Sequence, residues 1–548
     1  MADTALLEVS GLSVEFHARG RVTRAVRDVS WSVNRGETLA ILGESGSGKS
    51  VSAAAVMGLI DIPPGRITSG RITFDGRDLL PLSRLARRDL NGRRIAMIFQ
   101  DPLAHLNPVF PVGWQVAEAM RVHGVPNAQA EARALALLER VGIPRAAERM
   151  GSYPHEFSGG QRQRIMIAMA VAMKPDLLIA DEPTTALDVT VQAQILTLLS
   201  ELRDETGMGL VLITHDLGVV AKHADRLVVM KDGEVVETGR VDAVFAAPRH
   251  PYTCQLLGAA PGRLPFRTPD EGAPPLLEVD RLGKTYHLPG RLLGPRPSAM
   301  RALDGVSFTL RQGETLGIVG ESGSGKTTLA RLLLRLTMPS DGRALYRGKD
   351  IFTMSPAELF RFRRRVQVVF QDPTASLNPR MTVEQIIGEH WEIHPEAAPA
   401  EGRRAAVAAL LEQVGLDPSH AERHPHQFSG GQRQRIAIAR ALSLKPEIIL
   451  CDEAVSALDV SVQAQVIQLL KDLQVSHGLS YIFIAHDLPV VRDFADRVLV
   501  MSRGAIVEQG PTRQVFTNPR EEYTRTLLAA SPEAEDFLGS RSDAEVTA

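Results

Sequence analysis

Short, wholly apolar runs lie between amphipathic stretches in the first half of the chain. Residues 177–180 and 210–213 are apolar without a break, which is typical of strands buried on both faces of a parallel sheet. Between them, residues 191–202 place apolar side chains at 191, 195, 198, 199 and 202, the spacing of one helical face. A strand–helix–strand order of this kind predicts an α/β unit.

Three further patterns extend this unit. Residues 12–16 alternate apolar and polar side chains, which predicts an opening strand of an antiparallel part. Helical periodicity within residues 103–173 predicts a helical insertion. Lys231-Asp232-Gly233 interrupts the apolar segment 227–236 and indicates a hairpin. We therefore expect an α/β core with an antiparallel β part and a helical subdomain.

The second half repeats the first. Gln100 recurs as Gln371, and this shift of 271 positions is kept at residues 158, 182 and 215. The second copy also carries seven extra residues, in the Pro/Gly-rich loop 288–298. Repetition over such a length indicates two copies of one module.

Prolines divide the two copies. They lie at positions 261, 265, 269, 274 and 275, which predicts an extended linker. We expect a first module at 1–260 with a C-terminal extension, a linker at 261–275, a second module with its own extension at 276–530, and a polar, disordered tail at 531–548.

Composition limits the class of protein. The chain has 548 residues and a formal net charge of −2, which argues against a broad nucleic-acid-binding surface. Two cysteines, Cys254 and Cys451, cannot build a disulfide framework or a four-cysteine metal site. The first residues lack a signal-peptide pattern, and the sequence contains no apolar run of about eighteen residues. We expect a soluble, cytoplasmic protein that does not bind nucleic acid.

A glycine-rich motif follows the apolar run 38–42 and precedes a helix-compatible segment. It reads Gly43-Glu44-Ser45-Gly46-Ser47-Gly48-Lys49-Ser50 and recurs as Gly320-Glu321-Ser322-Gly323-Ser324-Gly325-Lys326-Thr327, followed by Thr328. Both copies match the phosphate-loop pattern, in which glycines let backbone N–H groups approach phosphate oxygens. The lysine is expected to reach the β- and γ-phosphates of a nucleotide, and the Ser50 or Thr327 hydroxyl to hold Mg²⁺.

Two carboxylates end an apolar strand in each module. They are Asp181-Glu182 in the first and Asp452-Glu453 in the second. The aspartate is expected to hold Mg²⁺, directly or through water. The glutamate is expected to polarise the water that attacks the γ-phosphorus.

A serine-glycine-glycine motif completes the set of motifs in each module. Phe157-Ser158-Gly159-Gly160-Gln161 recurs as Phe428-Ser429-Gly430-Gly431-Gln432, ahead of a helix whose N-terminus favours anions. Here the chain resembles the ATP-binding-cassette (ABC) ATPases, whose signature is close to LSGGQ, with phenylalanine in place of the leucine. The resemblance covers both modules almost end to end. It implies two tandem ABC modules, each with a P-loop (RecA-like) α/β core, and ATP as the nucleotide.

The resemblance implies roles for further residues. Gln100 and Gln371 resemble the glutamine that touches Mg²⁺ and the attacking water and reports nucleotide state to a transmembrane partner. His215 and His486 resemble the switch histidine that hydrogen-bonds the γ-phosphate. Ala186-Leu187-Asp188 and Ala457-Leu458-Asp459 match the loop that joins the two active sites in the family. Phe16 and Tyr286 lie where the family stacks an aromatic side chain on adenine, and His17 or His287 are the alternatives for this role.

Modules of this family pair head to tail, so that the signature of one closes over ATP on the phosphate loop of the other. The resemblance therefore implies that Lys49 and its partners face Ser429, and that Lys326 and its partners face Ser158. Because both modules keep the catalytic residues, we expect two hydrolytic sites.

One turn departs from this symmetry. Ala454-Val455 stands where the first module has Pro183-Thr184. We expect this difference to loosen the turn after Glu453 and to slow the second site.

Local motifs resemble the dipeptide, oligopeptide and nickel importer ATPases. Phe-Gln-Asp-Pro occurs at 99–102 and at 370–373, and a Tyr-Thr pair follows each module, at 252–253 and 523–524. This resemblance implies the energy-coupling subunit of an importer, peripheral at the cytoplasmic face of the inner membrane. It also implies two transmembrane permease subunits and an extracytoplasmic solute-binding protein. Peptides are the expected solute, with glutathione, a peptide antibiotic or nickel as alternatives.

A tandem-cassette translation factor that acts on the ribosome is the main alternative. Proteins of that class resemble this chain in carrying two cassettes. They usually join them by a long, charged helix, whereas the linker here is short and proline-rich.

Overall fold

The computed structural model describes residues 5–18, 20–184, 187–287, 299–400, 402–456 and 458–531. The chain forms two compact units, which are divided in sequence between Ala260 and Pro261. The predicted loop 288–298, the tail beyond Ser531, and two members of the predicted joining loops, Ala186 and Ala457, lie outside the described residues.

The first unit begins with a strand and ends with a short helix. Its elements are β1 (Leu7–Ala18), β2 (Arg21–Val33), β3 (Thr38–Leu42), α1 (Lys49–Met57), β4 (Gly65–Phe74), β5 (Arg77–Asp78), α2 (Arg84–Leu90), β6 (Ile95–Ile98), α3 (Pro102–His105), α4 (Val112–Arg121), α5 (Asn127–Arg140), α6 (Ala146–Arg149), α7 (Gly159–Val171), β7 (Leu177–Asp181), α8 (Val189–Thr206), β8 (Gly209–Thr214), α9 (Leu217–His223), β9 (Arg226–Lys231), β10 (Glu234–Arg240), α10 (Val241–Ala246) and α11 (Pro251–Gly258).

The second unit repeats this order. Its elements are β11 (Pro275–His287), β12 (Ala299–Arg311), β13 (Thr315–Val319), α12 (Lys326–Leu333), β14 (Asp341–Tyr346), β15 (Lys349–Asp350), α13 (Pro356–Arg365), β16 (Val366–Val369), α14 (Pro373–Ser376), α15 (Val383–Ile393), α16 (Arg403–Gln413), α17 (Gly430–Leu442), β17 (Ile448–Asp452), α18 (Val460–His477), β18 (Ser480–Ile484), α19 (Leu488–Phe494), β19 (Arg497–Ser502), β20 (Ala505–Pro511), α20 (Thr512–Thr517) and α21 (Glu522–Ala530).

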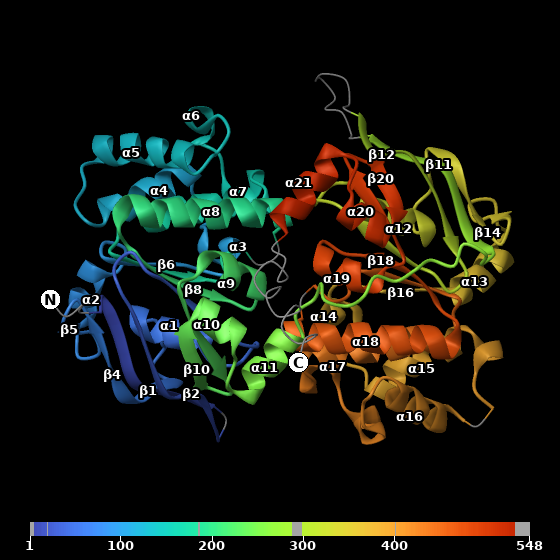
Figure 1. Cartoon of the computed structure of the whole chain (residues 1–548), viewed down its shortest axis with the longest axis horizontal. Coiled ribbons are helices and arrows are strands. Elements are labelled where there is room, and N and C mark those ends of the chain that lie inside the picture. The colour runs from blue at the N-terminus through green and yellow to red at the C-terminus, as the bar shows by residue number, and fades with distance from the viewer. Residues whose placement is uncertain are drawn as a thin grey trace, which may run out of the picture. The chain divides into compact units, whose positions relative to one another are not determined.

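Each unit is built on two sheets (Figure 1). In the first unit the strand order β10-β9-β3-β8-β7-β6 forms a sheet that is parallel except for the β9–β10 hairpin. Strands β2-β1-β4-β5 form an antiparallel sheet. The second unit has the same topology, as β20-β19-β13-β18-β17-β16 and β12-β11-β14-β15. The predicted α/β core with an antiparallel part is confirmed.

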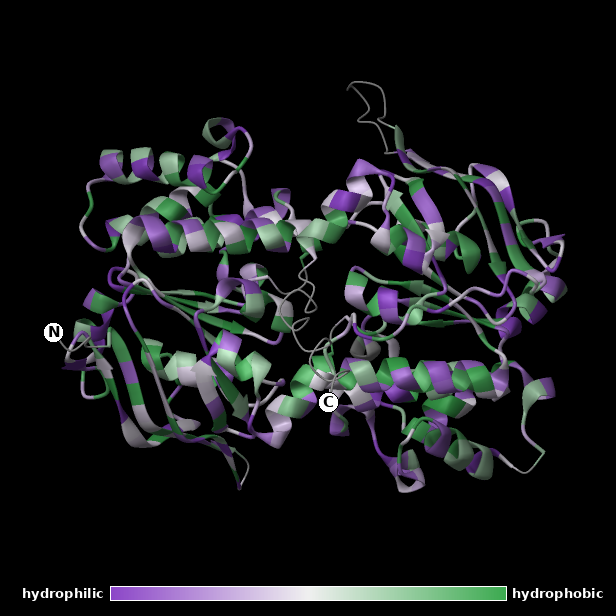
Figure 2. Cartoon of the chain, viewed as in Figure 1, coloured by the Kyte–Doolittle hydropathy of each residue, from purple (hydrophilic) through white to green (hydrophobic). Residues whose placement is uncertain are grey.

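Alternate residues of the central strands face two different cores. In β7, Leu177 and Ile179 pack with the antiparallel sheet and α1, whereas Leu178 and Ala180 pack with the helical region and α8. Figure 2 shows these central strands mainly as apolar and α8 as a mixture of apolar and polar residues. Continuous apolar runs are needed here because both faces of the strands are covered.

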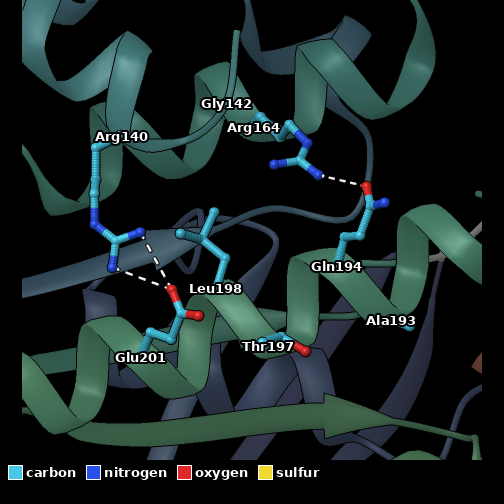
Figure 3. A pocket seen from close by; sticks show the side chains of 8 residues that line it. All are labelled: Arg140, Gly142, Arg164, Ala193, Gln194, Thr197, Leu198 and Glu201. Atoms are coloured by element: carbon cyan, nitrogen blue, oxygen red, sulfur yellow. Dashed lines mark hydrogen bonds and ion pairs between the residues drawn. The ribbon is translucent and has the colours of Figure 1, made fainter.

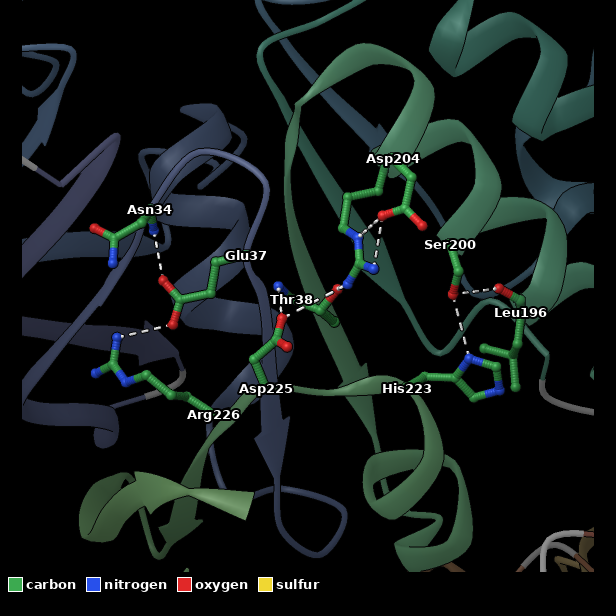
Figure 4. Close-up of polar contacts among 10 residues, drawn as sticks. Asn34, Glu37, Thr38, Leu196, Ser200, Asp204, His223, Asp225 and Arg226 are labelled. Atoms are coloured by element: carbon green, nitrogen blue, oxygen red, sulfur yellow. Dashed lines mark hydrogen bonds and ion pairs between the residues drawn. The ribbon is translucent and has the colours of Figure 1, made fainter. Parts of the chain in front are cut away.

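Polar contacts fix the beginning of β3, the strand that leads into the glycine-rich motif (Figure 4). The Thr38 N–H donates to Asp225 Oδ2 at 2.8 Å, and its hydroxyl accepts from Arg203 at 2.7 Å. Arg226 donates to the neighbouring Glu37 at 3.1 Å. In the second unit, Thr315 is held in the same way, by Asp496 and Gln474.

An arginine of α7 ties the helical region to α8 (Figure 3). Arg164 donates to the carbonyl oxygen of Val141 at 2.6 Å and to Gln194 Oε1 at 2.8 Å. Arg140, at the end of α5, donates to Glu201 at 3.2 Å. The first of these arginines has a counterpart in the second unit, Arg435, which donates to the Val414 carbonyl and to Gln465. The helical region and α8 are thus joined by side-chain contacts as well as by the chain.

The proline-rich segment before β11 is fastened to the second unit. The Gly262 N–H donates to Asp493 Oδ2 at 2.7 Å, and Arg267 Nε lies 3.0 Å from Asp496 Oδ1. Residues 261–274 contain neither helix nor strand, and β11 begins at Pro275. No helix among the described residues is both long enough and apolar enough to cross a membrane.

Candidate active site

The glycine-rich motif forms the turn between β3 and α1. Gly48 has φ +97°, and a Cβ there would collide with the Ala25 carbonyl oxygen, so this position requires glycine. Lys49 is 5% exposed, and its Nζ donates to the carbonyl oxygens of Gly43 at 2.7 Å and Glu44 at 2.9 Å. The second unit repeats these bonds from Lys326 to Gly320 and Glu321, at 2.6 and 3.0 Å. Each loop therefore closes around its own lysine.

A buried hydroxyl in each loop fits a phosphate group. Ser47 and Ser324 are each 4% exposed, and their Oγ atoms have no hydrogen-bond partner within the part of the chain that the structure describes. A buried hydroxyl without a partner is costly, and a phosphate oxygen at the N-terminus of α1 or α12 would accept its hydrogen. The loops therefore fit the phosphates of a nucleotide.

The aspartates at the ends of β7 and β17 fit a hard cation. Ser50 Oγ donates to Asp181 Oδ1 at 2.9 Å, so two predicted metal ligands of the first unit are adjacent. Burial raises the pKa of Asp181, and it raises the pKa of Asp452 in the second unit. A nearby divalent cation favours the charged carboxylate and offsets this cost. Hydroxyl and carboxylate oxygens are ligands that suit Mg²⁺.

The structure brings together glutamine, glutamate and histidine at the ends of β6, β7 and β8. Gln100 Nε2 donates to Glu182 Oε2 at 2.7 Å, and His215 Nδ1 lies 3.5 Å from Glu182 Oε1. Because the carboxyl ends of adjacent parallel strands share one edge, residues far apart in sequence meet there. The second unit repeats both contacts, with Gln371 Nε2 at 2.6 Å and His486 Nδ1 at 3.7 Å from Glu453 Oε2.

Electrostatics favour an ion pair in the second unit. The hydrogen bond with His486 lowers the pKa of Glu453. Burial would lower the pKa of His486, but the contact with Glu453 and the nearby charge of Asp487 raise it above its usual value. Each partner thus stabilises the charged form of the other.

Both glutamates have a left-handed backbone, which the sequence did not indicate. Glu182 has φ +46° and Glu453 has φ +50°. Such a conformation is strained for a residue with a side chain and persists only where its surroundings fix it. Here each N–H donates to a carbonyl oxygen of the neighbouring strand at 2.9 Å, that of Ile213 in the first unit and that of Ile484 in the second.

The serine-glycine-glycine motif begins α7. Ser158 Oγ accepts from the Gln161 N–H at 3.3 Å, and Gln161 Oε1 accepts from the Ser158 N–H at 3.2 Å. This capping box satisfies the N–H groups of Ser158 and Gln161 at the start of the helix. A Cβ at Gly160 would lie 2.5 Å from Val191 of α8, so the second glycine also allows close helix packing. Ser429 and Gln432 form the same box on α17, and a Cβ at Gly431 would collide with Val462.

Comparison with known families identifies this arrangement. The profile described as "ABC transporter" matches residues 26–185 and 303–456. The chain belongs to the ABC transporter family. A second profile, "Oligopeptide/dipeptide transporter, C-terminal region", matches residues 236–287 and 507–543. The resemblance stated from the motifs, the fold of two ABC modules and the ATPase activity are thereby confirmed.

Named relatives match this ABC ATPase over nearly its whole length. It is 50% identical to "Peptidoglycan transport ATP-binding protein YejF" of Agrobacterium fabrum, with 96% of each chain covered. It is 49% identical to "Glutathione import ATP-binding protein GsiA" of Salmonella typhimurium, covering 97% of this chain and 90% of the relative. It is also 49% identical to the "Uncharacterized ABC transporter ATP-binding protein YejF" of Escherichia coli, covering 96% and 99%.

The two aromatic residues lie on strands, and the aspartates of the joining loops lie at the starts of helices. Phe16 is on β1 and Tyr286 is on β11, both in the antiparallel sheets, and each is partly buried. Asp188 and Asp459 precede α8 and α18 as their N-cap residues. The ATP contacts expected of these residues stay predictions.

Sequence reasoning missed one contact of each phosphate loop. The hydroxyl of Tyr252, in the C-terminal extension, accepts a hydrogen bond from the Glu44 N–H at 3.3 Å. Tyr523 accepts the equivalent bond from Glu321 at 3.2 Å. The repeated Tyr-Thr pair was visible in the sequence, but it gave no indication that the tyrosine touches the loop.

Proposed function

We propose that this ABC ATPase is the energy-coupling subunit of an importer for peptides or related small solutes. The transporter C-terminal region that follows each ATPase core supports this most directly, because an ATPase core alone would not distinguish transport from other work. Relatives carry names for glutathione import and peptidoglycan transport, and both solutes contain amino acids joined in peptides. The same region favours transport over a role on the ribosome.

The proposed assembly contains two transmembrane permease subunits, with this chain peripheral at the cytoplasmic face of the inner membrane. An extracytoplasmic binding protein would deliver the solute to the permeases. In this arrangement the solute touches those other subunits, so the residues of this chain act on ATP alone.

Hydrolysis at the first loop is proposed to follow from the contacts described above. Lys49 exchanges its carbonyl partners for the β- and γ-phosphates, and Ser50 with Asp181 would hold Mg²⁺. The ion, when bound, neutralises charge on the phosphate oxygens. Glu182 accepts the proton of the water that attacks the γ-phosphorus, and ADP departs as phosphate is released. Gln100 and His215 both lie against this carboxylate. From there Gln100 would contact Mg²⁺ and the attacking water, and His215 would hydrogen-bond the γ-phosphate, as the family resemblance implies. Lys326, Thr327, Asp452, Glu453, Gln371 and His486 are assigned the same work in the second unit.

Each ATP is proposed to be shared between modules, as the family resemblance implies. The capping box leaves the first N–H groups of α7 and α17 at a helix N-terminus, where an anion is favoured. Ser429 with its glycines would close over ATP on the first loop, and Ser158 with its glycines over ATP on the second.

Reconstitution tests the transport function. The full chain is co-purified with the two permease subunits of the proposed assembly and placed in proteoliposomes with a candidate solute-binding protein. We expect ATP-dependent uptake of a labelled tripeptide, and ATP hydrolysis stimulated several-fold by the loaded binding protein. Competition by glutathione, a peptide antibiotic or Ni²⁺ distinguishes the solutes. Hydrolysis stimulated by ribosomes, with no uptake and no copurifying permease, would contradict the proposal.

A further inference from the structure

The C-terminal extension of the first unit reaches back to the phosphate loop. Tyr252, in the first turn of α11, is 4% exposed, and its hydroxyl oxygen accepts from the Glu44 N–H at 3.3 Å. The carbonyl oxygen of the same Glu44 accepts from Lys49 Nζ at 2.9 Å. One loop residue is therefore held on one side by the catalytic lysine and on the other by a side chain 208 positions away.

The second unit makes the same pair of contacts independently. Tyr523 in α21 accepts from the Glu321 N–H at 3.2 Å, and the Glu321 carbonyl oxygen accepts from Lys326 Nζ at 3.0 Å. The residues in this pair are 202 positions apart rather than 208. The contact is thus kept although the chain between its ends differs in length.

A clamp on the β9–β10 hairpin positions the tyrosine. Glu237 of β10 accepts from the N–H groups of Arg249 at 2.8 Å and His250 at 3.1 Å, just before α11. His250 Nδ1 accepts from the Tyr252 N–H at 3.2 Å, and Lys231 Nζ lies 4.8 Å from the centre of the Tyr252 ring. The second unit repeats the carboxylate clamp, with Glu508 accepting from the N–H groups of Arg520 and Glu521.

Packing alone does not require the hydroxyl, because phenylalanine would fill the same space. What recurs in both units is a polar contact to one backbone group, at the second residue of the phosphate loop. The N–H of that residue donates to the tyrosine and its carbonyl oxygen accepts from the lysine, so its orientation helps to set the path of the anion-binding turn.

We propose that Tyr252 and Tyr523 are positioning residues for nucleotide binding. Each hydroxyl holds the first half of its phosphate loop in the conformation that accepts ATP, and so links the C-terminal extension to ATP affinity. ATP binding, which the family establishes, is required for this role, whereas import of a solute is not.

Loss of the hydroxyl is expected to weaken ATP binding while leaving chemistry nearly unchanged. Without this bond a smaller fraction of the loops is in the binding conformation, and the apparent affinity for ATP falls in proportion to that fraction. One neutral hydrogen bond corresponds to a change of about 3- to 10-fold. Because the hydroxyl accepts from the loop backbone, while Glu182 receives Gln100 and lies beside His215, kcat should change less than about twofold.

The test uses the full-length chain with Tyr252→Phe and Tyr523→Phe combined. Steady-state hydrolysis gives KM and kcat for ATP. Direct titration with a fluorescent ATP analogue gives Kd in a Glu182→Gln/Glu453→Gln background, where hydrolysis is stopped. Tyr346→Phe is the matched control, because its buried hydroxyl donates to Glu447 and not to a phosphate loop. We expect KM and Kd to rise about 3- to 10-fold in the double variant and to stay constant in the control.

A second pair of substitutions tests the same proposal if the tyrosine variants are too unstable to measure. Glu237→Gln with Glu508→Gln weakens the clamp and leaves the hydroxyl, so we expect a smaller rise of KM in the same direction. Unchanged KM and Kd in the folded tyrosine variant would overturn the proposal. A lower melting temperature without nucleotide, with no change in KM, would also overturn it by showing a role in stability alone. Failure of solute import would not affect these constants, since they are measured with ATP only.

Discussion

The two phosphate-loop sites of the chain have the same backbone conformation and contacts at their glutamates, Glu182 and Glu453. They differ in the residues of the turn that follows each glutamate. Both glutamates are left-handed, both are bonded to the neighbouring strand at 2.9 Å, and both receive a glutamine amide within 2.7 Å. The next two residues are proline and threonine in the first unit but alanine and valine in the second. The two glutamates therefore share one backbone conformation and the same strand-edge contacts although the residues after them differ.

The expected loosening of the second turn has no counterpart in its contacts. The Ser456 N–H and Oγ both donate to the Glu453 carbonyl oxygen, at 3.2 and 2.9 Å. Ala454 and Val455 are buried, at 3% and 2% exposure. The equivalent of Ser456 in the first unit, Thr185, lies outside the described residues. A slower second site stays a prediction, and these contacts favour a small difference.

Removing the two proposed catalytic carboxylates is the test of the comparison with the largest expected effect on the hydrolysis rate. The double variant Glu182→Gln/Glu453→Gln should lose hydrolysis by about 100-fold or more, because a general base contributes about 10² to 10⁴ in rate. If both sites work separately and the second is the slower, Glu182→Gln should lose about half of the steady-state rate or more, and Glu453→Gln about half or less. Phosphate release at saturating ATP measures all three.

ATP binding is the control for these variants. Because glutamine has nearly the same size as glutamate, ATP binding should be kept while hydrolysis is lost. Full activity in Glu453→Gln together with none in Glu182→Gln would show that only the first site is competent.

A variant that tests whether each ATP site is shared between modules should have the next largest effect on the hydrolysis rate. In a Glu453→Gln background, hydrolysis should occur at the first loop only. Adding Ser429→Arg should then reduce the remaining rate about 10- to 100-fold, because a bulky cation would displace the signature from the ATP it is proposed to contact. ATP binding at the first loop should stay largely intact.

Ser158→Arg in the same background is the matched control. Both serines cap their helices with the same bonds, so both variants lose a similar contribution to helix stability. Shared sites would be contradicted if Ser158→Arg reduced the hydrolysis rate more than Ser429→Arg does. They would also be contradicted if Ser429→Arg reduced ATP binding at the first loop as much as it reduces hydrolysis.

The sequence predicted those elements and motifs whose pattern lies in consecutive residues. Apolar runs predicted β7 and β8, and the glycine-rich motif with its flanking residues predicted a phosphate loop between a strand and a helix. The resemblance also named Gln100 and His215, although only the strand order shows why they reach one glutamate. Periodicity cannot give such an order, because it reports faces of elements and not their neighbours.

Tertiary features without a local pattern could not be predicted. The left-handed glutamates carry no glycine or asparagine to indicate positive φ. The contact of Tyr252 with Glu44 joins residues 208 positions apart. The signature predicted an anion-binding helix N-terminus, but not that a Cβ at Gly160 would lie 2.5 Å from Val191, which gives a further reason for glycine there.

Exchanging the divergent turns should have the smallest effect. In a Glu182→Gln background only the second site hydrolyses ATP, and Ala454→Pro with Val455→Thr gives it the turn of the first. Because Glu453 and Glu182 already share one backbone conformation, we expect the rate to change less than about threefold. Proline at this position should also raise stability by about 0.4–1 kcal/mol, since it restricts the unfolded chain. Phosphate release and thermal unfolding without nucleotide measure the two effects.

The reciprocal exchange, Pro183→Ala with Thr184→Val in a Glu453→Gln background, is the matched control and should slow the first site by a similarly small factor. If either exchange changed the rate about tenfold, a shift of about 1.4 kcal/mol in the barrier, the turn would be governing the position of the carboxylate. The bonds from Glu182 and Glu453 to Ile213 and Ile484 would then be too weak to fix it. A small effect in both directions would instead assign control of the two sites to the strand edge that they have in common.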